Sequence, residues 1–272
     1  MDIKFKRKEY ETMDKKVMKR VKEHYDEVIK LGYEVVLVAL QGSQNYKLDI
    51  EGSDVDTKAI VLPKFEDIVL NRHPVSCTHV MDDGAHVDIK DIRLMFNEFK
   101  KANINFVELL FTEYVVINEK YTTTLLPVFT NREKIARYKP LAALKCATGT
   151  AIGEYKDLEK NFNGKTVSTI LRLELFMENY IDEKQYKDCI IPSNILDTLK
   201  AIKSGNHNIT KETLLMSSKH AVEHCKLLLE AYEKFYKPEV NKDIDILLND
   251  VVAEILADWL HKDIDNFKKI LN

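Results

Sequence analysis

The chain has 272 residues, of which 45% are hydrophobic and 31% charged, and its formal net charge is −3. This composition suits one or two globular domains, and the near balance of charges excludes an overall basic nucleic-acid-binding surface. The four cysteines form no C-x-x-C pair, which argues against a zinc ribbon or a disulfide framework. The longest aliphatic run, 35–40, is too short for a bilayer and no secretory signal is recognisable, so we expect a soluble cytoplasmic protein without a membrane partner.

The first half of the sequence alternates short β-branched runs with polar turns. A charged amphipathic segment at 9–31 is predicted to be a helix, because apolar residues recur on one stripe at every fourth position. Asp91 is predicted to cap a helix that begins at Ile92, and an apolar segment follows at 105–111. Apolar runs bounded by turn residues predict five strands, at 34–40, 54–62, 77–81, 86–90 and 115–117.

The second half has helical periodicity with few breakers. The predicted helices are 133–161, 165–181, 193–202, 211–236 and 244–271. We therefore predict an α+β protein with two domains. Residues 1–130 form a small mixed β-sheet flanked by helices, and residues 131–272 form an α-helical C-terminal domain.

The most informative stretch joins the first two predicted strands. Gly42 and Ser43 leave the first strand, and eleven residues after Ser43 the second strand opens with Asp54 and Asp56 around a valine. Because side chains alternate along a strand, the two carboxylates point to one face, where they repel each other unless a cation lies between them. Mg²⁺ is the natural cation, since it prefers oxygen ligands and retains phosphate oxygens, and Mn²⁺ is the alternative.

Gly42 and Ser43 suit a phosphate. Glycine lets the backbone approach a ligand closely, and the amides after the strand can hold β- and γ-phosphates together with the Ser43 hydroxyl. Two metal ions about 3.5–4 Å apart can then clamp the attacking and leaving oxygens of a displacement at phosphorus. A strand that merely begins with solvated aspartates is the alternative interpretation.

A third carboxylate is expected, because two ions need more oxygen ligands than two side chains give. Asp88 is our choice, since apolar and polar residues alternate in 86–90 and place Asp88 on the polar face of a strand. Asp91 is in the opposite phase and is better placed as a helix cap. An ordinary exposed strand residue remains the alternative for Asp88.

These residues resemble the signature of the DNA polymerase β-like nucleotidyltransferase superfamily: a strand, Gly-Ser, about ten residues, Asp-x-Asp and a later acidic residue. Within it, two motifs are similar to a branch of predicted nucleotidyltransferases from bacteria and phages. They are Gly42-Ser43-x-x-Tyr46-x-Leu48 and Ser53-Asp54-x-Asp56-x-Lys58.

The resemblance implies magnesium-dependent transfer of a nucleoside monophosphate from a nucleoside triphosphate such as ATP to an acceptor hydroxyl, with release of pyrophosphate. Asp54, Asp56 and Asp88 would be the catalytic and metal-binding residues, and Asp88 would help deprotonate or orient the acceptor hydroxyl. Nucleotide-binding residues would include Gly42, Ser43, Tyr46 and Ser53.

The resemblance extends more weakly into the second half. The segment 165–173 is similar to a helical motif with Lys, His and Arg, in which Lys165 and Arg172 match while Thr169 stands at the histidine position. This departure puts a histidine-dependent role in doubt and leaves Lys165 and Arg172 as candidate phosphate contacts. The sequence Gly164-Lys165-Thr166 is not a P-loop, because Glu159 replaces the required earlier glycine.

Two questions stay open at the sequence level. The acceptor is unassigned among an RNA end, including that of tRNA, a second nucleotide, a small molecule and a protein hydroxyl. The rival to an enzyme is a catalytically inactive nucleotide- or partner-binding module that retains the fold, and it gains if Asp88 does not meet Asp54 and Asp56. His220 and His224, one helical turn apart, lack an identifiable third zinc ligand, so a solvated helix face is the simpler interpretation.

Overall fold

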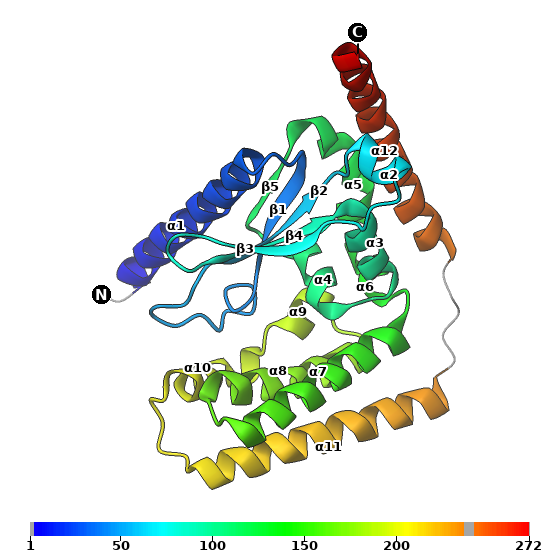
Figure 1. Ribbon diagram of the computed structural model, residues 1–272. Coiled ribbons are helices and arrows are strands. Elements are labelled where there is room, and N and C mark those ends of the chain that lie inside the picture. The colour runs from blue at the N-terminus through cyan, green and yellow to red at the C-terminus, as the bar shows by residue number, and fades with distance from the viewer. Residues whose placement is uncertain (1–2, 237–241, 272) are drawn as a thin grey trace.

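The computed structural model describes residues 3–236 and 242–271, with side-chain environments for 15–236 and 242–264. Within these residues the chain is an α+β protein, with a small mixed β-sheet flanked by helices and a region of long helices on one side of it (Figure 1). The predicted fold class is confirmed. None of the described helices carries an apolar run long enough to cross a bilayer.

The strand order in the sheet is β3-β4-β2-β1-β5. The strands are β1 (Val35–Gln41), β2 (Asp56–Val61), β3 (Ser76–Val80), β4 (His86–Asp91) and β5 (Val115–Ile117). β2 and β4 are parallel, and the other neighbours are antiparallel. All five predicted strands are present. β2 begins two residues later than predicted, at Asp56, which pairs with the last residue of β1, Gln41.

Helix α1 (Ile3–Lys30) covers one face of the sheet (Figure 1). Val21 and Val28 of this helix are fully buried in one apolar cluster with side chains from β1, β2 and β4. Burial of each such side chain stabilises the fold by about 1.5–3 kcal/mol. The apolar residues at every fourth position, which predict the helix, therefore also predict which face of the helix is buried.

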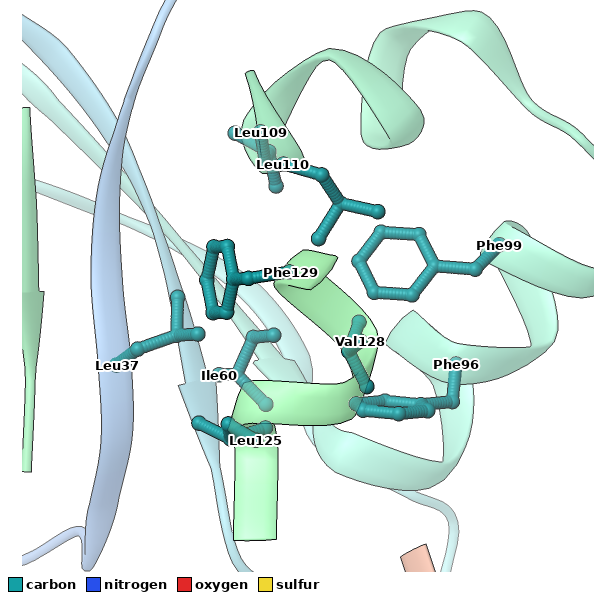
Figure 2. Close-up of a pocket in the computed structure, with 9 residues that line it drawn as sticks. All are labelled: Leu37, Ile60, Phe96, Phe99, Leu109, Leu110, Leu125, Val128 and Phe129. Atoms are coloured by element: carbon teal, nitrogen blue, oxygen red, sulfur yellow. The ribbon is translucent and has the colours of Figure 1, made fainter. Parts of the chain in front are cut away.

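The opposite face of the sheet packs on α3 (Ile92–Lys100), α5 (Thr122–Thr130) and η1 (Glu108–Leu110). Figure 2 shows the contact, where Leu37 and Ile60 of the sheet face Phe96, Phe99 and Leu125. Every residue lining this small space is apolar, so it belongs to the hydrophobic core and not to a ligand site. Asp91 caps α3 as predicted, accepting a hydrogen bond from the Arg93 backbone nitrogen at 2.8 Å.

The predicted helix 133–161 is two helices. Pro140 lies in the first turn of the second helix, where the missing amide hydrogen of proline costs nothing. The same proline prevents the first helix from continuing into the second. The remaining helices are α2 (Phe65–Val69), α4 (Ile104–Val107), η2 (Glu119–Tyr121), α6 (Arg132–Arg137), α7 (Pro140–Lys160), α8 (Gly164–Ile181), α9 (Tyr186–Ile190), η3 (Ser193–Ile195), α10 (Leu196–Ser204), α11 (Lys211–Phe235) and α12 (Lys242–Leu271).

Helices α7, α8, α10 and α11 form the helical region next to the sheet, while α12 packs against α2, α3 and α5 (Figure 1). The Trp259 indole nitrogen of α12 donates to the Pro63 carbonyl at 2.8 Å, and Thr124 donates to Glu254 at 3.0 Å. The domain boundary at residue 130 stays a prediction. The last helix nevertheless lies against elements of the first half of the sequence.

Candidate active site

The loop 42–55 joins β1 to β2 and brings both ends of the predicted motif to one end of the sheet. Gln41 pairs with Asp56, so Gly42 and the aspartates lie beside each other at the start and finish of the loop. Gly42 has φ +87°, a left-handed conformation that glycine adopts without a steric penalty. Inside the loop, the Asn45 side chain donates to the Leu40 carbonyl at 2.8 Å, which holds the turn after the strand.

Asp54 and Asp56 present carboxylate oxygens at this end of the sheet. The Asp54 side chain is exposed and makes no hydrogen bond or ion pair with any residue whose side chain is described, while its backbone carbonyl accepts from Gln44 at 2.6 Å. Asp56 accepts a hydrogen bond from the His86 backbone nitrogen at 2.9 Å and has one oxygen left. Carboxylates with uncommitted oxygens suit Mg²⁺, which prefers carboxylate and water ligands.

Asp88 lies on the same face of the sheet but is already engaged. Its register partner on β2 is Lys58, so Asp56 lies diagonally from it, with about 8 Å between the Cα atoms for ordinary strand spacings. Lys58 Nζ is 3.3 Å from one Asp88 oxygen, and Thr78 donates to the other at 2.9 Å. Among described side chains, Asp54, Asp56 and Asp88 do not form a cluster of converging ligand atoms. A metal bound by Asp54 and Asp56 would reach Asp88 only if Asp88 exchanged Lys58 for the ion.

Asp88 is nevertheless held in its ionised form. Burial alone would raise the pKa of Asp88, but the hydrogen bond from Thr78 and the charges of Lys58 and Lys90 outweigh burial and lower the pKa below its ordinary value. An ionised carboxylate on this face can accept a proton or bind a cation.

Glu108 is a functional candidate that the sequence reasoning missed. It is only 5% exposed, and the Tyr46 hydroxyl donates a hydrogen bond to it. Burial raises the pKa of Glu108, opposed by the charge of Arg172, the Tyr46 hydroxyl, the charge of Lys58 and the Gly42 backbone N–H. Glu108 thus ties Gly42 and Tyr46 to the core and fixes the conformation of the loop. A glutamate inside the apolar run 106–111 is the signal that could have identified it.

The helical region contributes positive charge beside the loop. The Arg172 guanidinium of α8 lies 3.8 Å from the centroid of the Tyr46 ring and is only 7% exposed. Lys203 of α10 donates to the Leu48 carbonyl at 2.9 Å, and its pKa is lowered, first by burial and then by the charge of Lys165. Lys165 itself is exposed at the start of α8. The two predicted phosphate contacts therefore lie on the helix that faces the loop.

Two further predicted residues have structural roles that compete with ligand binding. The Ser53 hydroxyl accepts from the Ile50 backbone nitrogen at 3.0 Å and closes the turn before the aspartates. The Tyr46 ring and hydroxyl are occupied by Arg172 and Glu108. Close packing explains why residue 164 is a glycine, because a Cβ there would lie 2.1 Å from the Ile202 carbonyl oxygen.

No family model and no curated protein matches the sequence of the chain. Among solved structures, the chain is similar to a nucleotidyltransferase-like protein from Exiguobacterium sibiricum 255-15, at 11% sequence identity and a TM-score of 0.30, over 79% of this chain and 75% of that chain. A likeness at this level leaves the function to be argued from the site itself.

Proposed function

We propose that the protein is a magnesium-dependent nucleotidyltransferase that moves a nucleoside monophosphate from a nucleoside triphosphate such as ATP to an acceptor hydroxyl. The pairing of Gln41 with Asp56 is the observation that supports this most strongly. It brings Gly42 beside Asp56, which has one oxygen left to bind a cation, and the exposed Asp54 precedes Asp56 by two residues. This is the arrangement that the interval between Gly42-Ser43 and Asp54-x-Asp56 predicts.

In this proposal each group has a defined task. Gly42 and Ser43 bind the β- and γ-phosphates, and Lys165 and Arg172 add positive charge from α8. Mg²⁺ held by Asp54 and Asp56 would neutralise charge on the reacting phosphate and on the leaving pyrophosphate. The acceptor oxygen forms a bond to the α-phosphorus, and the bond from the α-phosphorus to the bridging oxygen of the β-phosphate breaks. The acceptor proton passes to Asp88 and then to solvent.

The experiment is an activity screen. The protein is incubated with each labelled nucleoside triphosphate and Mg²⁺ or Mn²⁺, with and without cellular RNA including tRNA. We expect label in RNA, in protein or in a small product, together with one pyrophosphate per transfer. Asp54→Ala/Asp56→Ala should reduce the rate at least about 10³-fold, since the metal contributes several kcal/mol to the barrier. Absence of label and pyrophosphate under every condition, or full activity in the variant, contradicts the proposal.

A second function, binding without catalysis, is favoured by one observation: Lys58 occupies an oxygen of the third carboxylate. A catalytically inactive nucleotide- or partner-binding module would bind a non-hydrolysable triphosphate and never release pyrophosphate. Calorimetric titration of the same double variant separates the two functions. An enzyme that needs Asp54 and Asp56 to hold the metal should lose the Mg²⁺-dependent part of its nucleotide affinity, whereas a module that binds through the loop alone should keep its affinity.

A further inference from the structure

A second group of metal-ligating side chains lies between α8 and α11, outside the candidate active site. Glu174 and Glu178 are one helical turn apart on α8, and His224 of α11 faces them. Nδ1 of His224 is 2.9 Å from an oxygen of Glu174 and 3.6 Å from an oxygen of Glu178. Among residues with described side chains, only these three bring one ligand atom each to within 4.8 Å of the others.

The charges in this group need a partner. Carboxylates at positions i and i+4 of a helix repel each other. The Glu174 and Glu178 side chains are partly withdrawn from water, at 27% and 42% exposure, which weakens solvent screening of that repulsion. The imidazole of His224 lies within ion-pair distance of both carboxylates. A cation held between the three groups would neutralise the pair.

The spacing and the donor types suit a small transition-metal ion. Zinc binds imidazole nitrogen and carboxylate oxygen at about 2.0–2.2 Å, which places neighbouring ligand atoms of a tetrahedron about 3.3 Å apart. The separations of 2.9 Å and 3.6 Å from His224 Nδ1 lie on either side of this value. Imidazole favours zinc and related ions, whereas Mg²⁺ favours oxygen alone. The group therefore differs in metal preference from the aspartates at the end of the sheet.

We propose that Glu174, Glu178 and His224 bind one divalent transition-metal ion of the zinc class, which joins α8 to α11 and keeps a fourth position open to water. Residues two apart on a helix point about 200° apart, so the ion would hold α8 on the side away from Arg172 and the loop. The histidine pair seen in the sequence contributes one ligand only. The other two ligands of the ion, Glu174 and Glu178, come from α8, while His220 is exposed and lies outside the group.

The test uses the full chain carrying Asp54→Ala and Asp56→Ala, which removes the other acidic pair, after its metals are stripped with EDTA. Zn²⁺ is titrated in competition with a chromogenic zinc indicator, and Co²⁺ is titrated separately for its visible absorption. We expect one saturable Zn²⁺ per chain. His224→Ala and Glu178→Gln should each lower the affinity at least about tenfold, the loss that even indirect disturbance of a metal site causes.

His220→Ala is the matched control, one turn away on the same helix, and should bind Zn²⁺ like the parent. Zn²⁺ should raise the melting temperature of the parent and of His220→Ala, but not that of His224→Ala. Equal melting temperatures of all variants in EDTA show that the fold is intact. If His224→Ala does not fold, the Zn²⁺ affinity of Glu178→Gln tests the proposal instead. The proposal is overturned by absence of saturable binding in the parent, by unchanged affinity in the ligand variants, or by an equal loss in His220→Ala. Each of these outcomes would leave His224 an ion-pair partner of the two glutamates.

Discussion

The two faces of β2 carry different kinds of residue on one strand. Towards α1 the strand presents Thr57, Ala59 and Val61, all fully buried. Towards the other side it presents Asp56 and Lys58 before Ile60 returns to the core. Lys58 is only 8% exposed although it is charged. Lys58 is paired with Asp88, so its charge is compensated, but a buried ion pair contributes less to stability than apolar packing would. Such a departure from apolar packing is expected at functional sites.

The comparison extends to the groups that touch each face. On the side of the polar half-face, the buried carboxylate of Glu108 accepts hydrogen bonds from the Tyr46 hydroxyl and the Gly42 backbone N–H. Polar contacts therefore replace apolar packing there. On the apolar face, the buried His24 of α1 shares a hydrogen bond of 2.8 Å with the Thr57 hydroxyl. The first face should therefore respond to mutation in activity as well as stability, and the second in stability alone.

The largest effect on stability is expected at Glu108. Glu108→Ala removes the acceptor of the Tyr46 hydroxyl and leaves the charge of Arg172 buried without an opposite charge, so unfolding should cost about 4 kcal/mol less. Catalytic efficiency should fall at least about tenfold in the remaining folded protein, because the Gly42 loop loses its anchor. Glu108→Gln, which keeps an acceptor oxygen, is the control and should lose less unfolding free energy and less catalytic efficiency. Denaturant unfolding and pyrophosphate release measure the two effects, and a fully stable alanine variant would refute the role assigned to Glu108.

The next effect is a pH dependence from His24. Burial, assisted by the charge of Arg20, lowers the pKa of His24 from 6.5 to about 4. The folded protein therefore keeps His24 neutral in a range where the unfolded chain binds a proton. Its contribution to stability is complete above pH 6.5 and should be lost as the pH falls from 6.5 towards 4, by about 3 kcal/mol in total.

The measurement for His24 is denaturant unfolding across this pH range, for the wild type and for His24→Gln. The difference between the two proteins isolates this residue from the other titrating groups. We expect the variant to have the flatter profile. Parallel profiles would mean that His24 titrates alike in the folded and unfolded chain.

A smaller effect is expected at Val61, on the apolar face. Val61→Ala leaves a small cavity between β2 and α1 and should lower the unfolding free energy by about 2 kcal/mol. The polar half-face is untouched, so pyrophosphate release per folded molecule should stay within about twofold of wild type. Thermal unfolding and an initial-rate assay below the melting temperature check both statements. A large loss of specific activity would show that the two faces are coupled.

The smallest effect on stability is expected at Lys165. The side chain is exposed at the start of α8, so Lys165→Ala should change the unfolding free energy by less than about 0.5 kcal/mol. If it contacts phosphate, the KM for the triphosphate should rise about three- to tenfold with kcat unchanged. Lys160→Ala, at the end of α7, serves as the control for a simple loss of surface charge. An unchanged KM would remove Lys165 from the site.

Local patterns predicted much of this architecture. Apolar runs bounded by turn residues predict the strands, and Asp91 is predicted as a cap because its side chain needs only the next turn of backbone. The placement of Asp56 beside Gln41 and Gly42 follows from the pairing of two strands that are neighbours in sequence.

Long-range pairing was not predictable in the same way. Lys58 meets Asp88 because β2 and β4 are parallel neighbours, a register that depends on the whole sheet. The burial of Glu108 and the meeting of His224 with α8 likewise depend on tertiary packing between segments far apart in the chain. A motif that covers the loop alone therefore could not predict that Lys58 pairs with Asp88 or that Glu108 binds the Tyr46 hydroxyl.

In the proposed function, Asp54 and Asp56 at the start of β2 perform phosphoryl chemistry and do not hold the fold together. Its most direct test is pyrophosphate release by Asp56→Asn, which keeps an acceptor for the His86 backbone nitrogen but removes the charge. We predict a rate lowered about 10³-fold and an unfolding free energy within about 0.5 kcal/mol of wild type. A rate within tenfold of wild type, or a loss of activity that only follows unfolding, would contradict the account.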